Sequence, residues 1–414
     1  MPRQSVPRLL LLLPTATYRT AAFVEAARRL GVELTVASER PSTFQDANPG
    51  GLVTLDLSDP DRAAAQARAF GREHPLQGVV GVDDDTAVVA AAIADRLGLR
   101  GNAVVAARAA RDKHEQRTLL AAGVSYPCVL KPLRLAASRG VIRADTPEAF
   151  VAAFERVRRI LERAGCEMRD ASVSTDLASR IPHPASRSIL VEEFVPGPEV
   201  ALEGLLVAGQ LQVLALFDKP DPLDGPYFEE TIYVTPSRLP ADAQRAVAAC
   251  AERAAAALGL REGPVHAELR VNSRGPWLIE LAARPIGGRC SGALRFEIRE
   301  RGKGKGEMLS LEEIVIRHAL GMELPVLERE RQASGVMMIP VPGAGVLREV
   351  RGVDAARAVP LVEEVAIVAH PGQVLVPWPE GARYPGFIFA RGASPEAVET
   401  ALRAAHRELQ FVLV

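Results

Sequence analysis

The N-terminal part of the chain alternates between short apolar runs and segments with a helical pattern. The apolar runs, which are typical of buried strands, lie at residues 9–13, 32–37 and 78–82. The helical segments lie at residues 21–30, 60–70 and 86–97. Gly31 and Gly98 follow two of these segments, as glycine often does at the end of a helix. The alternation predicts an α/β domain with an open parallel sheet and right-handed crossovers.

The leucine run at residues 9–13 shares one property with a signal peptide, because Arg3 and Arg8 precede it. Pro14 ends the run before it reaches the roughly 7 to 15 apolar residues of a signal peptide. We therefore predict a buried strand. No other apolar run in the sequence reaches the length of a transmembrane helix.

The predicted α/β domain lacks the fingerprint of a dinucleotide-binding domain. A Gly-x-Gly-x-x-Gly turn would have to follow the first strand, and the first glycine is Gly31. Asp83, Asp84 and Asp85 instead follow the apolar run at 78–82, where ligands commonly bind in open α/β sheets. Acids in this position also begin helices, because they interact favourably with the helix dipole. We favour the helix start and keep the ligand site as the alternative.

From about residue 113 the pattern changes to strands, long helices and polar connections. Strands are predicted at residues 126–132, 191–195, 200–207, 265–271, 277–281 and 411–414. Helices are predicted at residues 111–121, 241–258, 310–320 and 395–409. Residues 166–188 and the Arg-Gly-Lys-Gly-Lys-Gly run at 301–306 are predicted to be surface loops. We therefore predict three domains, at residues 1–112, 113–320 and 321–414, of which the last is a small α+β domain.

Composition and charge exclude several classes of protein. The 414 residues include 50 Lys and Arg against 51 Asp and Glu, a net charge of −1. Without an excess of basic residues the chain is poorly suited to a nucleic-acid backbone, and we expect neither a nucleic-acid nor a membrane partner. The four cysteines are far apart and form no Cys-x-x-Cys pair, which argues against a zinc or redox centre and favours a reducing cytoplasm.

Two lysines and a loop of small residues suit the binding of a triphosphate. They are Lys113, Lys131 in Val-Leu-Lys-Pro, and Ser138 in the Ala-Ala-Ser-Arg-Gly-Val run at 136–141. Ammonium groups neutralise phosphate, and small side chains let backbone N–H groups approach its oxygens. The sequence contains no Gly-x-x-x-x-Gly-Lys-Ser/Thr loop, no His-Glu-x-x-His and no Gly-x-Ser-x-Gly motif.

A corner rich in proline follows the first strand of the central part. The run Val-Glu-Glu-Phe-Val-Pro-Gly-Pro-Glu at residues 191–199 breaks an apolar strand and places Glu199 opposite residues 192–194. Such a corner can offer backbone groups to the edge of an adenine while the carboxylate accepts ribose hydroxyls.

Glu268 and Glu280 lie on two successive predicted strands joined by a turn at 272–275. In a hairpin their side chains converge on one face, and paired carboxylates are the ligands that Mg²⁺ prefers when it bridges phosphates. The alternative is a pair of exposed acids beside Arg270 and Arg284. We favour the metal site, because both glutamates interrupt runs that are otherwise apolar.

In this order the segments resemble the ATP-grasp superfamily, specifically its carboxylate–amine ligase branch and, within it, the L-amino acid ligases. The resemblance covers nearly the whole chain and includes Ile-Glu-Leu-Ala-Ala-Arg-Pro-Ile-Gly-Gly at residues 279–288. It implies a lid at about 113–190, a central part at 191–320, and ATP with Mg²⁺ as cofactors, Mn²⁺ being an alternative metal.

The resemblance also implies a role for each candidate residue. Lys113 and Lys131 contact the ATP phosphates beside the Ser138 loop, and Arg284 faces the transferring phosphoryl group or the acyl phosphate. The adenine hinge consists of Glu192, Glu193, Phe194 and Val195. Glu199 contacts the ribose, and Glu268 and Glu280 bind Mg²⁺.

The reaction implied is amide formation from a small carboxylate and an amine, with amino acids as the expected class and with an acyl phosphate as intermediate. A homodimer is the oligomeric state to be tested. Two alternatives stay open: a bicarbonate-dependent carboxylase, and a nucleotide-binding protein without turnover. The chain departs from many relatives in having Ala282 in place of a metal-binding Asn, and a connection of only four positions between Gly123 and Pro127.

Overall fold

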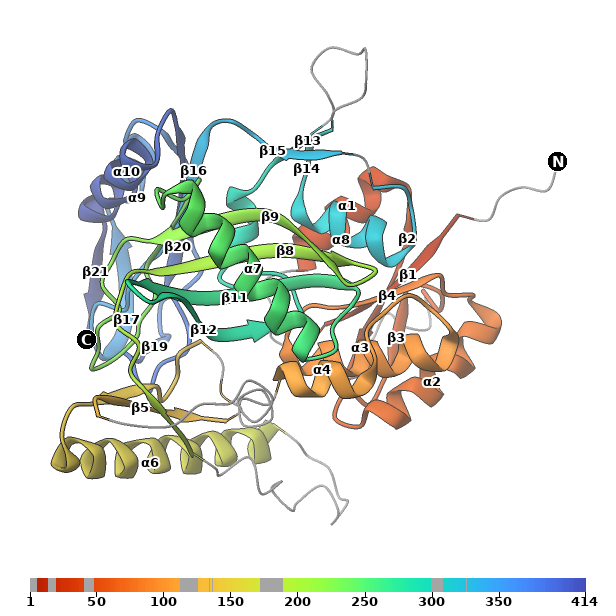
Figure 1. The fold of residues 1–414 in the computed structure, drawn as a ribbon, viewed down its shortest axis with the longest axis horizontal. Helices are drawn as coiled ribbons and strands as arrows, with labels where there is room; N and C mark the ends of the chain where they lie inside the picture. Colours follow the sequence, from red (N-terminus) through yellow and green to blue (C-terminus); the bar gives the residue numbers. More distant parts are fainter. Residues whose placement is uncertain are drawn as a thin grey trace.

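The computed structural model describes residues 6–13, 20–40, 48–111, 126–133, 135, 137–171, 189–298, 308–324 and 326–414. In Figure 1 the N-terminal domain lies at the right, the C-terminal region at the left, and a long helix at the lower left. Within the described residues, no helix is both long enough and apolar enough to cross a membrane.

The N-terminal domain is built on a four-stranded parallel sheet, which confirms the predicted α/β architecture. Its strands, in spatial order, are β3 (Leu52–Thr54), β2 (Glu33–Ser38), β1 (Arg8–Leu12) and β4 (Gly78–Gly81). Its helices are α1 (Thr20–Leu30), α2 (Pro60–Glu73), α3 (Asp84–Leu97) and α4 (Val104–Arg111). The strand β1 lies between β2 and β4, and its four leucines are completely buried, as expected of a central parallel strand that is covered on both faces.

The acidic run after β4 begins a helix. The Asp83 carboxylate accepts a hydrogen bond from the Thr86 backbone N–H at 2.8 Å, and the Thr86 hydroxyl accepts one from the Asp83 N–H at 3.1 Å. This reciprocal pair is a capping box. The helix-start interpretation is therefore confirmed for Asp83, while the side chains of Asp84 and Asp85 lie outside the described residues.

An eight-stranded sheet runs through the rest of the molecule. Its strands, in spatial order, are β12 (Gly275–Ala282), β11 (Gly263–Asn272), β8 (Glu199–Val207), β9 (Gln210–Lys219), β10 (Ile232–Thr235), β16 (Ala333–Met338), β20 (Gly386–Gly392) and β18 (Val362–Ile367). The pairing of β10 with β16 carries the sheet across the domain boundary predicted at residue 320. The exact boundary between these domains stays a prediction.

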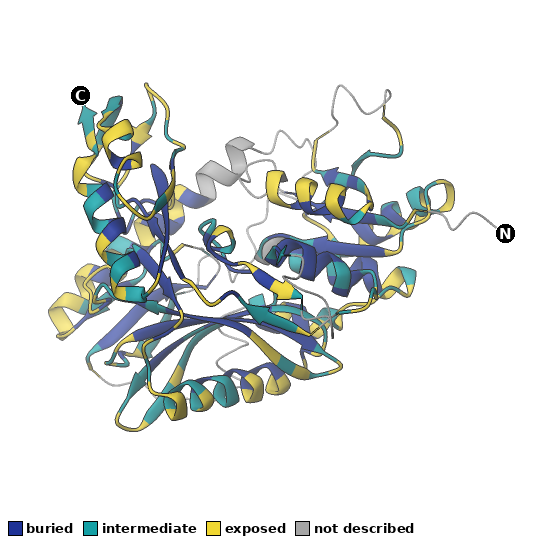
Figure 2. Ribbon diagram, turned by 90° about the horizontal axis from the view of Figure 1, so that it is seen from above, coloured by how far each residue is buried: buried dark blue, intermediate teal, exposed yellow. Residues whose placement is uncertain are grey.

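Helices cover both faces of this large sheet. The helix α7 (Ala241–Ala257) packs with α4 over Val200, Leu202 and Val265 on one face of the β8–β11 region (Figure 1). The helices α8 (Leu311–Ala319), α9 (Val353–Arg357) and α10 (Pro395–Glu408) complete the central and C-terminal layers. Figure 2 shows buried strands between helices whose outer faces are exposed.

A small separate sheet carries the predicted lid. Its strands are β6 (Ile142–Ala144), β5 (Cys128–Pro132) and β7 (Ile189–Glu193), in that spatial order, and α6 (Pro147–Ala171) packs on it. The prediction of a loop from residue 166 is wrong for residues 166–171, because the helix α6 continues to Ala171. The remainder of that predicted loop, residues 172–188, and the loop at 301–306 lie outside the described residues.

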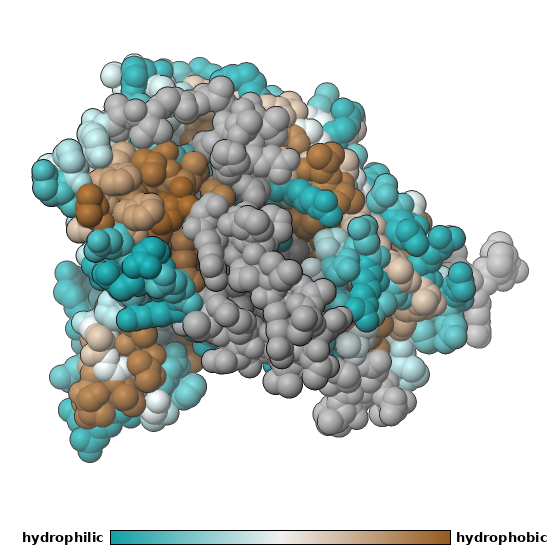
Figure 3. All heavy atoms as spheres, turned by 90° about the horizontal axis from the view of Figure 1, so that it is seen from below, coloured by the Kyte–Doolittle hydropathy of each residue, from teal (hydrophilic) through white to brown (hydrophobic). Residues whose placement is uncertain are grey.

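Shorter elements complete the fold. They are β13 (Phe296–Ile298), β14 (Met308–Leu309), β15 (Leu327–Arg329), β17 (Gly345–Arg351), β19 (Val374–Leu375), β21 (Gln410–Leu413) and the 3-10 helix η3 (Cys290–Ala293). Seen from below, the described surface is a mosaic of hydrophilic and hydrophobic patches (Figure 3).

Candidate active site

The predicted hairpin is present and brings Glu268 and Glu280 together. The strands β11 and β12 pair antiparallel, with Glu268 directly opposite Glu280 and with the turn at residues 272–275. The Glu268 side chain is 20% exposed, and Glu280 is half-buried. Both carboxylates therefore belong to one row across the sheet. That they bind a metal stays a prediction.

A buried lysine that the sequence analysis missed lies beside this hairpin. The Lys219 ammonium, at the end of β9, is 2.7 Å from a Glu199 oxygen, 2.5 Å from Glu230 and 3.1 Å from Glu268. Burial opposes the charge, but the three carboxylates hold the pKa of Lys219 well above its ordinary value. The sequence signal was available, because Asp-Lys-Pro ends an apolar strand here just as Val-Leu-Lys-Pro does at Lys131.

The carboxylates around Lys219 differ in their affinity for protons. Burial raises the pKa of Glu230 to about 7, helped by the neighbouring Glu268 charge and opposed by Lys219. Burial acts the same way on Glu268, but Lys219 and His266 hold the pKa of Glu268 well below its ordinary value. Glu268 is therefore ionised at neutral pH. Glu199, Glu230 and Glu268 offer oxygens within 4.8 Å of one another, and the Lys219 ammonium contacts all three carboxylates.

Glu199 is part of an ion-paired row across three strands. It lies opposite Lys219 on β9 and opposite Arg270 on β11, not opposite residues 192–194 as predicted, because β7 pairs with β5 instead. Its second oxygen accepts a hydrogen bond from Arg270 Nε at 2.9 Å. The Arg270 guanidinium also donates to the Val195 carbonyl at 2.9 Å. Glu199 is thus held between two cations, and the predicted ribose contact stays a prediction.

The predicted adenine hinge connects the lid sheet to the large sheet. Residues 192 and 193 end β7, and Phe194 is buried against Val129 and Phe228. The Phe194 N–H donates to the Pro127 carbonyl at 2.8 Å, and the Arg143 guanidinium lies 4.0 Å above the Phe194 ring. The hinge is therefore well anchored.

Of the two predicted phosphate-binding lysines, the structure describes one. Lys131 lies on β5 with its side chain 11% exposed, and its ammonium is 2.6 Å from a Glu192 oxygen on the neighbouring strand β7. Glu193, next along β7, is exposed. Lys113 lies outside the described residues.

The predicted small-residue loop forms a tight turn that is attached to the C-terminal region. Ala137, Ser138 and Gly140 have left-handed backbone angles of 57°, 54° and 72°. The Ala137 carbonyl accepts a hydrogen bond from the Trp378 indole at 2.8 Å, and the Gly140 N–H donates to the Pro379 carbonyl at 2.8 Å. The Gly140 N–H is therefore already engaged, and the phosphate contact assigned to Ser138 stays a prediction.

The loop that carries Arg284 follows β12 and is held by a buried acid. Glu203, with 0% exposure, accepts the Ile286 backbone N–H at 3.1 Å. The His266 ring lies between Glu203 and Glu268. Its Nδ1 is 3.4 Å from a Glu203 oxygen, and its Nε2 is 3.4 Å from a Glu268 oxygen. Burial raises the pKa of Glu203, and the nearby His266 and Arg284 oppose this. The sequence analysis missed Glu203 and His266, although the two-residue spacing of His266 and Glu268 indicates one face of a strand.

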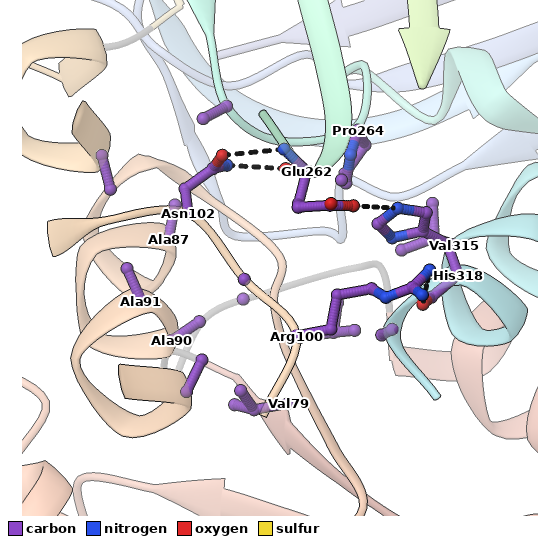
Figure 4. A pocket seen from close by; sticks show the side chains of 18 residues that line it. Val79, Ala87, Ala90, Ala91, Arg100, Asn102, Glu262, Pro264, Val315 and His318 are labelled. Carbon is purple, nitrogen blue, oxygen red and sulfur yellow. Dashed lines mark hydrogen bonds and ion pairs between the residues drawn. The ribbon is translucent and has the colours of Figure 1, made fainter. Parts of the chain in front are cut away.

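A cavity of about 80 Å³ lies at the junction of the N-terminal and central domains (Figure 4). Alanines of α3 line one side, and the polar end contains Arg100, Asn102, Glu262 and His318. These polar groups contact one another. His318 Nε2 is 2.9 Å from a Glu262 carboxylate oxygen, and the Asn102 side-chain amide donates to the Glu262 backbone carbonyl at 2.7 Å. The cavity wall thus joins the two domains.

Comparison with known families identifies the class of protein that this fold and site define. An ATP-grasp domain model matches residues 124–293, an ATP-grasp N-terminal domain model matches residues 24–101, and the model of L-amino acid ligase C-terminal domain 2 matches residues 337–414. The chain is an ATP-grasp protein with an L-amino acid ligase C-terminal domain. The family resemblance seen in the sequence is thereby confirmed, and the ATP-grasp fold implies ATP binding.

The individual relatives point in the same direction. The structure is similar to that of an L-amino acid ligase from Bacillus licheniformis, with a TM-score of 0.77, 25% identity and 99% of both chains covered. The sequence is 31% identical over 228 residues to alanine–anticapsin ligase from Bacillus subtilis, covering 47% of this chain and 45% of the relative. It is 30% identical over 306 residues to carnosine synthase 1 from Gallus gallus, covering 63% and 30%. The matches therefore span less than half the length of these two curated relatives.

Proposed function

We propose that this chain is an ATP-dependent ligase that joins the carboxylate of one amino acid to the amine of a second molecule. The observation that carries the proposal is the in-register pair Glu268–Glu280. The buried Lys219 ammonium lies beside Glu268, and Arg284 follows Glu280 by four residues. The match of residues 337–414 to an L-amino acid ligase domain supports amino acids as the substrate class.

In this proposal ATP lies between the lid sheet and the large sheet. The strand β7 leads through residues 192–195 into β8, so adenine at this hinge would contact both sheets. Lys131 and Ser138, both on the lid, would then face the phosphates, together with Lys113. The Lys131–Glu192 ion pair, only 2.6 Å long, keeps the ammonium oriented before ATP arrives.

The residues at the hairpin fit a hard divalent cation. Glu268 and Glu280 supply anionic oxygens from facing strand positions, and Glu268 is ionised at neutral pH because Lys219 and His266 lower its pKa. Mg²⁺, or Mn²⁺ in its place, would neutralise phosphate charge here when bound. The Ala282 side chain offers no ligand atom, so Glu268 and Glu280 would hold the ion at this row when it is bound.

The reaction would proceed in two balanced steps. A substrate carboxylate oxygen attacks the γ-phosphorus of ATP, the bond to the β-phosphate oxygen breaks, and acyl phosphate and ADP form. The amine nitrogen then attacks the acyl carbon, phosphate leaves with the bonding electron pair, and the nitrogen loses a proton. Arg284 and Lys131 would stabilise charge on the transferring group, since phosphoryl transfer depends mainly on positioning and electrostatics.

The test is ADP release in the presence of Mg·ATP and pairs of amino acids, with the product identified by mass. We expect ADP only when both an acid and an amine are present, and we expect Glu280→Gln to abolish it while the fold stays intact. Glu252→Gln is the matched control, because this exposed glutamate lies on α7 over the opposite face of the sheet. ADP formation that requires bicarbonate would favour the carboxylase alternative, and ATP binding without ADP formation would favour the protein without turnover.

A further inference from the structure

The buried Glu203 carboxylate connects two parts of the proposed site. Both of its oxygens lie within hydrogen-bond distance of the Ile286 backbone N–H, at 3.1 and 3.3 Å. Ile286 is two residues beyond Arg284 in the loop that follows β12. A side chain from β8 therefore fixes the backbone of the loop that carries Arg284.

The His266 ring continues this connection to the other side. In the sheet His266 lies directly opposite Glu203 on β8 and opposite Ala282 on β12. Its Nδ1 is 3.4 Å from a Glu203 oxygen, and its Nε2 is 3.4 Å from a Glu268 oxygen. The small side chain of Ala282 is therefore the ring's neighbour on the third strand. The resulting order of contacts is Ile286, Glu203, His266 and Glu268.

We propose that Glu203 and His266 are positioning residues that hold the Arg284 loop and the Glu268 carboxylate in one fixed arrangement during phosphoryl transfer. The inference rests on the proposed function, since Arg284 and Glu268 are assigned their roles there. Phosphoryl transfer is sensitive to such placement, because a shift of about 1 Å in a reacting group can reduce the rate by roughly 100-fold.

The chemistry of the buried pair supports positioning over simple packing. A buried charged pair is on average no more stabilising than apolar side chains of the same volume, so stability alone gives little reason for an acid at residue 203. The partners of Glu203 all belong to the proposed site: the Ile286 N–H, the His266 ring and the positive charge of Arg284. The same position filled by an apolar residue would leave the Ile286 N–H without this acceptor.

The experiment compares Glu203→Ala with the conservative variant Glu203→Gln. The steady-state kcat, the KM for ATP and the hydrogen exchange of the Ile286 amide are measured for each. Glu203→Ala should lower kcat by about 10- to 100-fold while the KM for ATP changes by less than about threefold, and it should speed exchange at Ile286. Glu203→Gln keeps an acceptor oxygen, so it should retain most of kcat and the slow exchange. His266→Phe, which keeps a ring but no nitrogens, should lose kcat without speeding exchange at Ile286.

Glu313→Ala is the matched control. Glu313 is also completely buried, and it accepts a backbone hydrogen bond from Ser310 at 2.7 Å, but it lies on α8. This control should lower the melting temperature while kcat stays within about twofold of the wild type.

The outcomes separate this inference from the proposed function. If Glu203→Ala speeds exchange at Ile286 and leaves kcat unchanged, Glu203 is purely structural and the inference is wrong. If Glu203→Gln loses as much kcat as Glu203→Ala, the acceptor oxygen is not what matters and the inference is also wrong. A wild-type protein that forms no ADP with any substrate pair overturns the proposed function itself, whereas an active wild type with an undiminished Glu203→Ala variant overturns only the positioning role.

Discussion

Replacing Lys219 by methionine is expected to destabilise the folded protein strongly. The variant keeps an unbranched side chain but removes an ammonium that contacts carboxylates at 2.7, 2.5 and 3.1 Å. These carboxylates lie within 4.8 Å of one another, so they repel once the cation is gone. Removing one partner of a buried ion pair typically costs about 3–5 kcal/mol. We expect the free energy of unfolding at pH 8 to fall by about that amount.

The loss should be smaller at pH 5 than at pH 8. Burial acts to raise the pKa of both Glu230 and Glu268, and in the wild type Lys219 opposes this at both carboxylates; at Glu268, together with His266, it brings the net pKa well below the ordinary value. Without Lys219 the folded variant therefore holds protons that an unfolded chain, with glutamate pKa values near about 4.3, has already released. A folded state that binds more protons than the unfolded state gains stability as the pH falls. The destabilisation should accordingly decrease through the range from pH 8 to pH 5.

Urea unfolding followed by tryptophan fluorescence and circular dichroism measures this difference. The double variant Lys219→Met/Glu230→Gln removes one of the repelling charges and should recover part of the lost stability. Arg403→Met is the control, because Arg403 pairs with Glu399 and Asp221 at a side-chain exposure of 37%, and exposed pairs contribute at most about 1 kcal/mol. An equal loss at pH 5 and pH 8, without recovery in the double variant, would refute the reasoning.

Three further predictions follow from the same groups. Burial raises the pKa of Glu230 to about 7, so the ionisation of Glu230 lowers the stability of the wild type as the pH rises from about 4.3 to 7. The free energy of unfolding of Glu230→Gln should lack that loss across this range, and a pH profile equal to that of the wild type would contradict the prediction. Glu199→Ala should weaken the binding of ATP by about 1.5–3 kcal/mol through lost charge-assisted hydrogen bonds, and it should weaken the binding of 2′,3′-dideoxy-ATP much less. Equal losses for the two nucleotides in calorimetry would mean that Glu199 serves only its ion pairs. Peptides from β5 to the first half of α6 should exchange amide hydrogens faster without ligand than with Mg·ATP, while β1 hardly changes; equal exchange in both states would show a static lid.

Local sequence patterns were sufficient to predict much of the N-terminal fold and the hairpin. Residues 9–13 could be assigned because an uninterrupted apolar run suits a buried parallel strand. Glu268 and Glu280 could be assigned to one hairpin because a short turn joins their strands. Their direct pairing could not be predicted, because it depends on a β-bulge between Glu268 and Leu269 that shifts Glu268 from Ile279 to Glu280. The helix start at Asp83 follows from the side chain and its third neighbour, Thr86.

The groups that the sequence analysis missed come together through pairing between distant segments. Lys219 meets Glu199 and Glu268 only because β8 lies between β9 and β11 in the sheet. Glu203 reaches Ile286 across 83 positions in the sequence. The Asp-Lys-Pro run marks Lys219 as a strand-end lysine like Lys131, but neither the order of strands nor the partner that a side chain meets across the sheet has a local signal.

The pairing of β10 with β16 makes the C-terminal region a poor unit for exchange between related ligases. Four residue pairs, from Ile232 with Met337 to Thr235 with Ser334, join these strands, and both strands are completely buried. A chimaera cut between them would expose a long apolar strand edge, which invites aggregation. Engineers who wish to graft a new C-terminal segment onto this chain should therefore transfer β16 together with β10, or leave the whole eight-stranded sheet intact and alter only its loops.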